Sequence, residues 1–177
     1  MRAGLDLSIN GSGIYFEDGS IYYQSTVKKE IINTEKIRSN LVRGSKGKLD
    51  TLKYFENGNN IINICKEKGL TEVGIEGYAY GYKSTVGLVF SLAEFTGIVK
   101  CLLIQNNIKL NIFPPKQIKR FATKNGSATK IKMVNKFFEL EKESPLNEMK
   151  TRGFNIYESP CNDVIDAYWV YKLLIYN

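Results

Sequence analysis

Arg2-Ala3-Gly4-Leu5-Asp6-Leu7-Ser8-Ile9-Asn10-Gly11, at the start of the chain, is the stretch that decides the fold. Its apolar residues alternate with small or polar ones, which is the period-two pattern of a β-strand. The strand contains one acid, Asp6, and an unpaired carboxylate is costly to bury. Asp6 therefore needs a cation, either a Lys or Arg partner or a metal, unless it only caps the turn at Asn10-Gly11. The other acids of the chain decide between these interpretations.

The length and composition predict one folded domain. The chain has 177 residues, of which 43% are hydrophobic and 12% aromatic, enough for a proper core. It contains no uninterrupted run of apolar residues long enough to span a membrane, and the N-terminus enters a strand directly, without a signal-peptide pattern. Cys65, Cys101 and Cys161 share no close spacing. We interpret them as reduced thiols and expect a cytoplasmic protein.

Positive charge is concentrated in one segment. The net charge is +7, and the segment 109–136 contains eight Lys or Arg residues and no acid. This favours a polyanionic partner, with nucleic acid ahead of a membrane surface because no amphipathic anchor helix accompanies the charge. A soluble basic face is the simpler alternative.

The chain has no histidine. This excludes Ser-His-Asp triads, Cys-His pairs and histidine-ligated zinc. Any hydrolytic chemistry must therefore use carboxylates, lysine or a metal-bound water.

The pattern of elements predicts an α/β fold with a five-stranded mixed sheet flanked by helices. Asp18-Gly19 is a strong hairpin signal, so three antiparallel strands open the chain and two parallel strands follow. The segment 28–48 is expected to be a long polar connection and 142–158 an irregular one. The remaining elements are expected at 49–68 (helix), 71–76 (strand), 84–106 (helix), 108–113 (strand), from 115 (short helix), 128–141 (helix) and 160–176 (helix).

Four acids lie at positions from which they can converge. Asp6 lies within the first strand, Glu76 ends a later strand, and Asp163 and Asp166 are spaced i, i+3 at the start of the last helix. On their own, the last two are more typical of an ordinary helix N-terminus. If the strand 71–76 lies parallel beside the first, Asp6 and Glu76 point the same way. Oxygen-only clusters suit Mg²⁺ or Mn²⁺, and two such ions roughly 4 Å apart activate a water for phosphodiester hydrolysis.

These residues also carry a resemblance to a known family. The stretch Gly4–Gly13 resembles the first motif of ribonuclease H-like resolvases of the RuvC group, particularly the phage-type versions. Ile75-Glu76, followed by an aromatic loop and a long helix, is similar to the second motif. Phe113–Lys119 and Lys124–Lys130 resemble the basic segment after the last strand, and Asn162–Ala167 resembles the C-terminal Asp-x-x-Asp-Ala motif. The similarity covers nearly the whole chain in the same order.

The resemblance implies a ribonuclease H-like nuclease domain over 1–177 that cuts four-way (Holliday) DNA junctions as a homodimer with Mg²⁺ or Mn²⁺, leaving 5′-phosphate and 3′-hydroxyl ends. Asp6, Glu76, Asp163 and Asp166 correspond to the metal-binding tetrad of that family. Lys119 and Lys130 correspond to its catalytic or phosphate-contacting lysines. The expected DNA-binding residues are Lys116, Lys119, Arg120, Lys124, Lys130, Lys132, Tyr78 and Tyr80.

Two departures and several alternatives accompany this hypothesis. The family often has a Phe three residues after the glutamate, where this chain has Ala79, and an Asp-Pro-Gly turn where this chain has Asp6-Leu7-Ser8. A broader nuclease for branched DNA, flaps or RNA is the nearest alternative, and a junction-binding protein without catalysis is a second. A phosphotransferase of the sugar-kinase and actin type is set aside, because 177 residues leave no room for its second phosphate loop and adenosine site.

Overall fold

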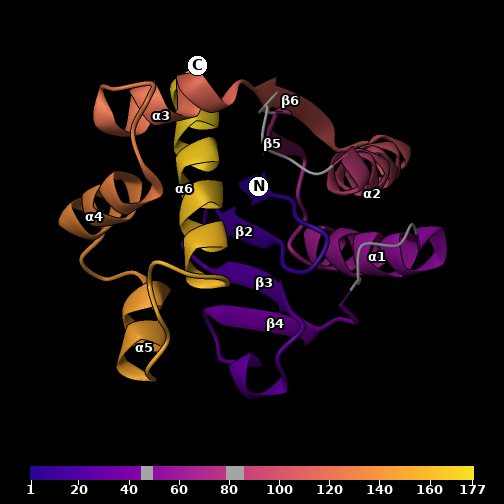
Figure 1. Ribbon diagram of the computed structural model, residues 1–177, viewed down its shortest axis with the longest axis horizontal. Helices are drawn as coiled ribbons and strands as arrows, with labels where there is room; N and C mark the ends of the chain where they lie inside the picture. The colour runs from indigo at the N-terminus through magenta and orange to yellow at the C-terminus, as the bar shows by residue number, and fades with distance from the viewer. Residues whose placement is uncertain (45–49, 79–85) are drawn as a thin grey trace.

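The computed structural model describes residues 1–44, 50–78 and 86–177 and shows a mixed β-sheet between two layers of helices (Figure 1). The strands are β1 (Arg2–Asp6), β2 (Gly13–Phe16), β3 (Ile21–Ser25), β4 (Ile37–Leu41), β5 (Glu72–Glu76) and β6 (Lys109–Phe113). The helices are η1 (Lys28–Glu30, 3-10), α1 (Thr51–Glu67), α2 (Val86–Gln105), α3 (Pro115–Thr123), α4 (Lys130–Leu140), α5 (Pro145–Thr151) and α6 (Cys161–Tyr176).

The sheet has the strand order β4-β3-β2-β1-β5-β6. Strands β1, β2 and β3 form the predicted antiparallel meander, and β5 and β6 run parallel to β1. The hairpin turn between β2 and β3 places Gly19 at a φ of 77°, a left-handed conformation that glycine adopts without steric cost. The predicted mixed α/β architecture is therefore confirmed.

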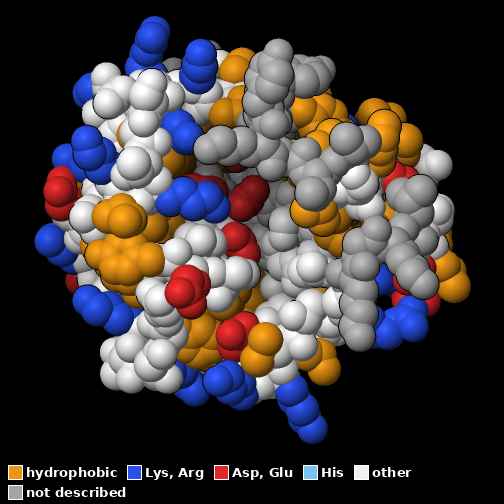
Figure 2. Space-filling view, viewed as in Figure 1, with side chains coloured by type: hydrophobic (Ala, Val, Ile, Leu, Met, Phe, Trp, Pro, Cys, Tyr) orange, Lys and Arg blue, Asp and Glu red, His pale blue; other side chains and the backbone are white. Residues whose placement is uncertain are grey.

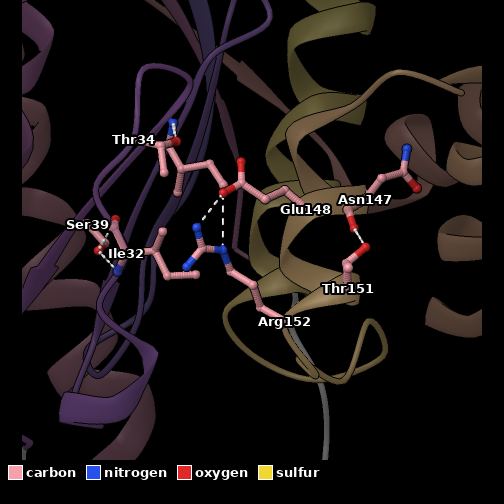
Figure 3. Close-up of polar contacts among 8 residues, drawn as sticks. Ile32, Thr34, Ser39, Asn147, Glu148, Thr151 and Arg152 are labelled. Atoms are coloured by element: carbon pink, nitrogen blue, oxygen red, sulfur yellow. Dashed lines mark hydrogen bonds and ion pairs between the residues drawn. The ribbon is translucent and has the colours of Figure 1, made fainter.

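The structure adds strand β4, helix α5 and the short 3-10 helix η1 to the prediction. Figure 3 shows polar contacts beside β4 and α5. Strand β4 lies in the segment that was expected to be a connection, and it runs parallel to β3. On the inner side of β4, the Ser39 hydroxyl bonds the backbone of Ile32, accepting from the N–H at 2.8 Å and donating to the carbonyl at 2.7 Å. Helix α5 lies in the segment expected to be irregular, and Arg152, directly after it, contacts Glu148 at 2.8 Å.

Each face of the sheet has its own hydrophobic core. One core joins α1 and α2 to the sheet through residues such as Leu5, Ile75 and Phe95. The other joins α3, α4, α5 and α6 to the opposite face, with Tyr168 and Phe137 among its buried residues. Because side chains alternate along a strand, Gly4 and Asp6 of β1 lie on the face opposite Leu5, which is the face that α6 covers.

Helix α6 lies directly on the backbone of the sheet. A Cβ atom at Gly4 would come within 2.0 Å of the Ala167 carbonyl oxygen, and one at Gly13 within 2.5 Å of the Asp163 carbonyl carbon. Only glycine permits this approach at either position, so the sequence of β1 and β2 determines where the first turns of α6 lie.

Helix α2 exposes much of its apolar surface. The stretch Gly87–Gln105 has a mean hydropathy of 1.8, and by length and composition alone it is long and apolar enough to cross a membrane. Only 28% of this stretch is buried inside the protein. The search for an uninterrupted apolar run in the sequence did not find this helix, because polar residues such as Ser91, Glu94 and Lys100 interrupt it.

Candidate active site

The parallel pairing of β1 and β5 places Asp6 and Glu76 side by side. The register pairs Gly4 with Gly74 and Leu5 with Ile75, so the next residues along both strands are the two acids. Both carboxylates lie at the carboxyl ends of parallel strands, where α/β proteins place their functional groups. The side-by-side arrangement predicted for these two acids is therefore present.

Helix α6 brings Asp163 and Asp166 to the same edge of the sheet. Asp163 lies in the first turn and is only 8% exposed, and Asp166 lies one turn further on. The Ser159 hydroxyl, just before the helix, donates a 2.5 Å hydrogen bond to Oδ2 of Asp163. The chain thus fixes the orientation of one carboxylate before any ligand is present.

Two lysines face the carboxylates from α3 and α4. The Lys130 ammonium lies 3.0 Å from Oδ2 of Asp166. A cavity of about 110 Å³ is lined by Lys119 and Lys130 together with Glu76 and Asp166. The structure therefore gathers four of the six predicted catalytic residues around one cavity. The other two, Asp6 and Asp163, lie close enough to interact electrostatically with Asp166 and Lys130.

Burial, and after it the repulsion between neighbouring carboxylates, disfavours the charged form of the acids. Burial, followed by the negative charges of Asp166, Asp163 and Glu76, holds the pKa of Asp6 well above its usual range. Burial and Asp166 raise the pKa of Glu76 to about 7, and burial raises the pKa of Asp163 to about 6.

The pKa is raised for both members of the ion pair between Asp166 and Lys130. The pKa of Asp166 is also raised by burial, against the opposing effect of Lys130. Burial opposes the charge on Lys130, but the carboxylates, Asp166 first, offset it and raise its pKa. This is a site with excess negative charge and two nearby lysines, of which Lys130 forms the ion pair with Asp166.

The donor set fits Mg²⁺ or Mn²⁺. Carboxylate oxygens are the ligands that these hard cations prefer, and a divalent cation would relieve the repulsion that raises the pKa of the acids. In the described ranges, no three Asp, Glu or Cys side chains are grouped closely enough to enclose an ion in this conformation. Lys130 occupies the position of counter-ion on Asp166 instead.

The loop after Asp6 is closed by serine hydroxyls rather than by the Pro-Gly pair of the resembled motif. The Ser8 hydroxyl accepts from the Gly11 N–H at 3.0 Å, and the Ser12 hydroxyl accepts from the Ser8 N–H at 3.2 Å and donates to the Ser8 carbonyl at 3.1 Å. Although this chain has Leu7-Ser8 where the family has Pro-Gly, the turn next to the candidate site is therefore still held by hydrogen bonds.

The basic segment forms one side of the site. Figure 2 shows acidic side chains in a hollow at the centre of this face, with Lys and Arg side chains on the α3–α4 side. Lys116, Arg120, Lys124 and Lys132 are exposed on or next to these helices. Tyr78 is 44% exposed at the end of β5, whereas Tyr80 and Ala79 lie outside the described residues.

Sequence reasoning missed two polar side chains at the site, Ser159 and Thr96. The Ser159-Pro160 pair precedes α6 and gave only a helix-start signal. Thr96 lies inside an apolar helix, 4% exposed, and lines a cavity shared with Asp6 and Glu76. No sequence motif marks Thr96, because its role depends on how α2 faces the sheet.

The mixed sheet with helices on both faces is an α/β fold of the ribonuclease H-like type. The chain is similar to the structure of Thermus thermophilus RuvC, with a TM-score of 0.63 and 13% identity over 99% of this chain and 95% of that chain. It is also similar to T. thermophilus RuvC in complex with Holliday junction substrate, with a TM-score of 0.62 and 13% identity over 96% and 89% of the two chains. The yeast mitochondrial Holliday junction resolvase Ydc2 matches with a TM-score of 0.60 and 15% identity over 96% of this chain and 75% of that chain. The fold of this chain is therefore the fold of RuvC.

No model of a known family matches the chain, and no curated protein matches it in sequence.

Proposed function

We propose that this protein is a metal-dependent, structure-selective DNA endonuclease that resolves four-way junctions by paired phosphodiester hydrolysis. The observation that carries the proposal is the meeting of Asp6, Glu76, Asp163 and Asp166 at one edge of the sheet, with raised pKa values and Lys130 as counter-ion. The same constellation lies on the fold of RuvC, which has been solved with a Holliday junction substrate.

The four carboxylates would hold two Mg²⁺ or Mn²⁺ ions. Bound there, the ions would activate a water for attack on the phosphate and stabilise the leaving oxygen. Ser159 holds the carboxylate of Asp163 in place through its 2.5 Å hydrogen bond. Lys130 balances the negative charge before the ions bind, and with Lys119 it neutralises the scissile phosphate afterwards.

The basic segment would follow the DNA backbone. Phosphate contacts position a protein on DNA without reading the sequence, and they make binding strongly dependent on salt. The exposed cations on and next to α3 and α4 provide such contacts beside the acidic hollow (Figure 2). Tyr78, which is 44% exposed just after β5, would stack on a base near the reacting phosphate.

Paired cutting requires two active sites, and we propose that two copies of the chain form a homodimer through α1 and α2. These helices expose six large apolar side chains, each 48% exposed or more, and so extensive an apolar surface marks a protein interface. They are Leu52, Phe55, Leu88, Val89, Phe90 and Ile104. Cys101 is exposed on α2, whereas Cys65 and Cys161 are buried.

The dimer is tested by sedimentation of wild-type protein and two matched variants. Phe90→Asp places a charge on the proposed interface at a side chain that is 62% exposed, so the fold is expected to tolerate it. Leu140→Asp makes the same change at a 54% exposed position on α4. Dimerisation lost only in Phe90→Asp supports the interface, and a wild-type chain that sediments as a monomer at micromolar concentration contradicts it.

The activity is tested with an immobile four-way junction beside linear duplex, a flap and an RNA–DNA hybrid, each with Mg²⁺ or Mn²⁺. Symmetric paired nicks in the junction alone support the proposal, and Asp6→Asn should bind the junction without cutting it. Cleavage of all the branched substrates would indicate a general nuclease for branched DNA instead. Tight binding without cutting in either metal would leave a junction-binding protein.

A further inference from the structure

Two buried hydrogen-bond donors without an acceptor lie one turn apart on α1. Among the residues that the structure describes, Nζ of Lys53 and Nδ2 of Asn57 are buried and have no hydrogen-bond partner. The two residues are 1% and 4% exposed. A buried ammonium without a counter-ion is costly, because the charge has lost its hydration and gained no partner in return. This pair of donors therefore suits a ligand that carries negative charge.

The surroundings of the Lys53 ammonium leave its charge uncompensated. The ammonium lies 5.9 Å from the centre of the Tyr54 ring, and Asp50 accepts the backbone N–H of Lys53 at 3.1 Å as the cap of α1. Burial lowers the pKa of Lys53, Asp50 opposes this effect, and the charge of Arg43 lowers the pKa further. The Arg43 side chain is 72% exposed and lies 3.6 Å from Glu56, a surface pair that contributes little. Positive charge therefore gathers at the start of α1.

Gln24 of β3 connects this part of α1 to the candidate active site. Its Nε2 donates to the Asn57 carbonyl at 2.9 Å, and its backbone N–H donates to the Ser12 carbonyl at 2.9 Å. A Cβ atom at Gly11 would lie 3.3 Å from the Gln24 carbonyl oxygen and 3.4 Å from Oδ2 of Asp163. The donors of α1 therefore lie near the acidic edge, on the face of the sheet opposite α3 and α4.

We propose that Lys53 and Asn57 bind a phosphate group, with Arg43 as the outer cation. A phosphate presents several acceptor oxygens and a negative charge, so one group satisfies both donors and neutralises the ammonium. The positive end of the α1 dipole, at Thr51, adds to the attraction. Water can accept the same hydrogen bonds but cannot neutralise the charge. Where the phosphate belongs to DNA, the inference rests on the proposed nuclease function, and this phosphate is a second one, separate from the scissile phosphate.

The first measurement is urea unfolding without DNA, phosphate or metal. Lys53→Met keeps most of the side-chain length and removes the charge, so its urea midpoint should be higher than that of wild type. Lys66→Met, at an exposed position further along α1, is the matched control and should leave the midpoint unchanged. A midpoint lowered by Lys53→Met would show that the ammonium is already compensated within the fold, and would overturn the proposal.

Two binding measurements then identify the source of the phosphate. In gel-shift titrations of a four-way junction in EDTA, Lys53→Met should lower the slope of log binding constant against log salt by about 0.9, the effect of one lost phosphate contact. In thermal unfolding, inorganic phosphate should raise the midpoint of wild type, but not of Lys53→Met, above that in chloride of equal ionic strength. Asn57→Asp gives the ammonium a carboxylate and should abolish both effects.

The result decides the site independently of cleavage. A changed salt slope assigns the site to the DNA backbone, and a response to inorganic phosphate alone assigns it to a free phosphate. Absence of both effects overturns the phosphate site, and the nuclease stands if wild-type protein still cuts the junction. A protein that cuts no junction in Mg²⁺ or Mn²⁺ overturns the proposed function, and the inorganic phosphate titration still decides whether Lys53 and Asn57 bind the anion.

Discussion

Replacing Glu76 with glutamine is expected to stabilise the metal-free protein at about pH 8 and to abolish cleavage. The pKa of Glu76 is about 7 in the fold against an ordinary value of 4.5, because burial and Asp166 disfavour its charge. The folded state therefore holds its proton more tightly than the unfolded chain does. By linkage, this group lowers the stability of the fold as the pH rises from about 4.5 to above about 7.

The magnitude follows from the same values. A shift from 4.5 to about 7, at about 1.4 kcal/mol per pKa unit, corresponds to about 3 kcal/mol of destabilisation above pH 7. Glutamine has the same shape and no charge, so Glu76→Gln should recover up to about 3 kcal/mol at pH 8 and nothing below about pH 4.5. The neighbouring acids retain their own repulsion, which makes this figure an upper bound.

Urea unfolding of the two proteins in EDTA, at about pH 8 and about pH 4.5, measures the difference. The matched control is Glu72→Gln at the other end of β5, because hydrogen bonds from Lys109 and Asn111 lower the pKa of Glu72. Neutralising that carboxylate should slightly destabilise the protein at pH 8. Glu76→Gln protein that is no more stable than wild type at pH 8 would refute the inference that burial, together with Asp166, disfavours the charge of Glu76 in the fold.

Magnesium should largely close the difference in stability between the two proteins at pH 8. A ligand that binds only the folded state at about 100 times its dissociation constant adds about 2.7 kcal/mol. Wild-type protein is expected to gain this stability and Glu76→Gln to gain much less. An equal gain in both proteins would place the metal elsewhere.

Three further outcomes follow from the structure. Gly4→Ala should destabilise the protein by about 3 kcal/mol or more, since the new Cβ would lie 2.0 Å from the Ala167 carbonyl oxygen; a near wild-type urea midpoint would show that α6 can lift from the sheet. Lys130→Met should slow junction cleavage at least about 100-fold while changing binding by only a few-fold, and single-turnover kinetics beside gel-shift titration separate the two effects. Lys116→Gln should lower the slope of log binding constant against log salt by about 0.9, whereas Lys66→Gln on α1 should leave it unchanged, and equal slopes in both variants would move the DNA away from α3.

The carboxylate arrangement was predictable because it depends on strand periodicity and parallel pairing. Glu76 ends its strand as predicted, whereas Asp6, expected within the first strand, is the last residue of β1. Asp163 and Asp166 lie near the start of a helix that is apolar on most sides. Once β5 is taken to be parallel to β1, one edge of the sheet collects the acids. Their chemistry then follows from the absence of histidine and the oxygen-only donor set.

The missed elements lack such periodicity. Strand β4 turns only Ile37 and Ser39 inward, and a buried serine hides the alternation that identifies a strand. Helix α5 has seven residues and two buried apolar ones, too few for a helical period. Its start was marked by Ser144-Pro145, since the Ser144 hydroxyl accepts from the Leu146 N–H at 3.2 Å and Pro suits the first helical position.

The contact of α6 with the sheet also determines which parts of the site can move. At Gly4 and Gly13 the helix backbone rests on the strand backbone with no side chain between them. Asp6 and Asp163 therefore stay at a fixed separation as long as the protein is folded. Helices α3 and α4 contact α6 through side chains such as Ile118 and Met133, which allow sliding. Adjustment to DNA is therefore expected on the lysine side, while the carboxylates act as the stationary frame against which the phosphate is aligned.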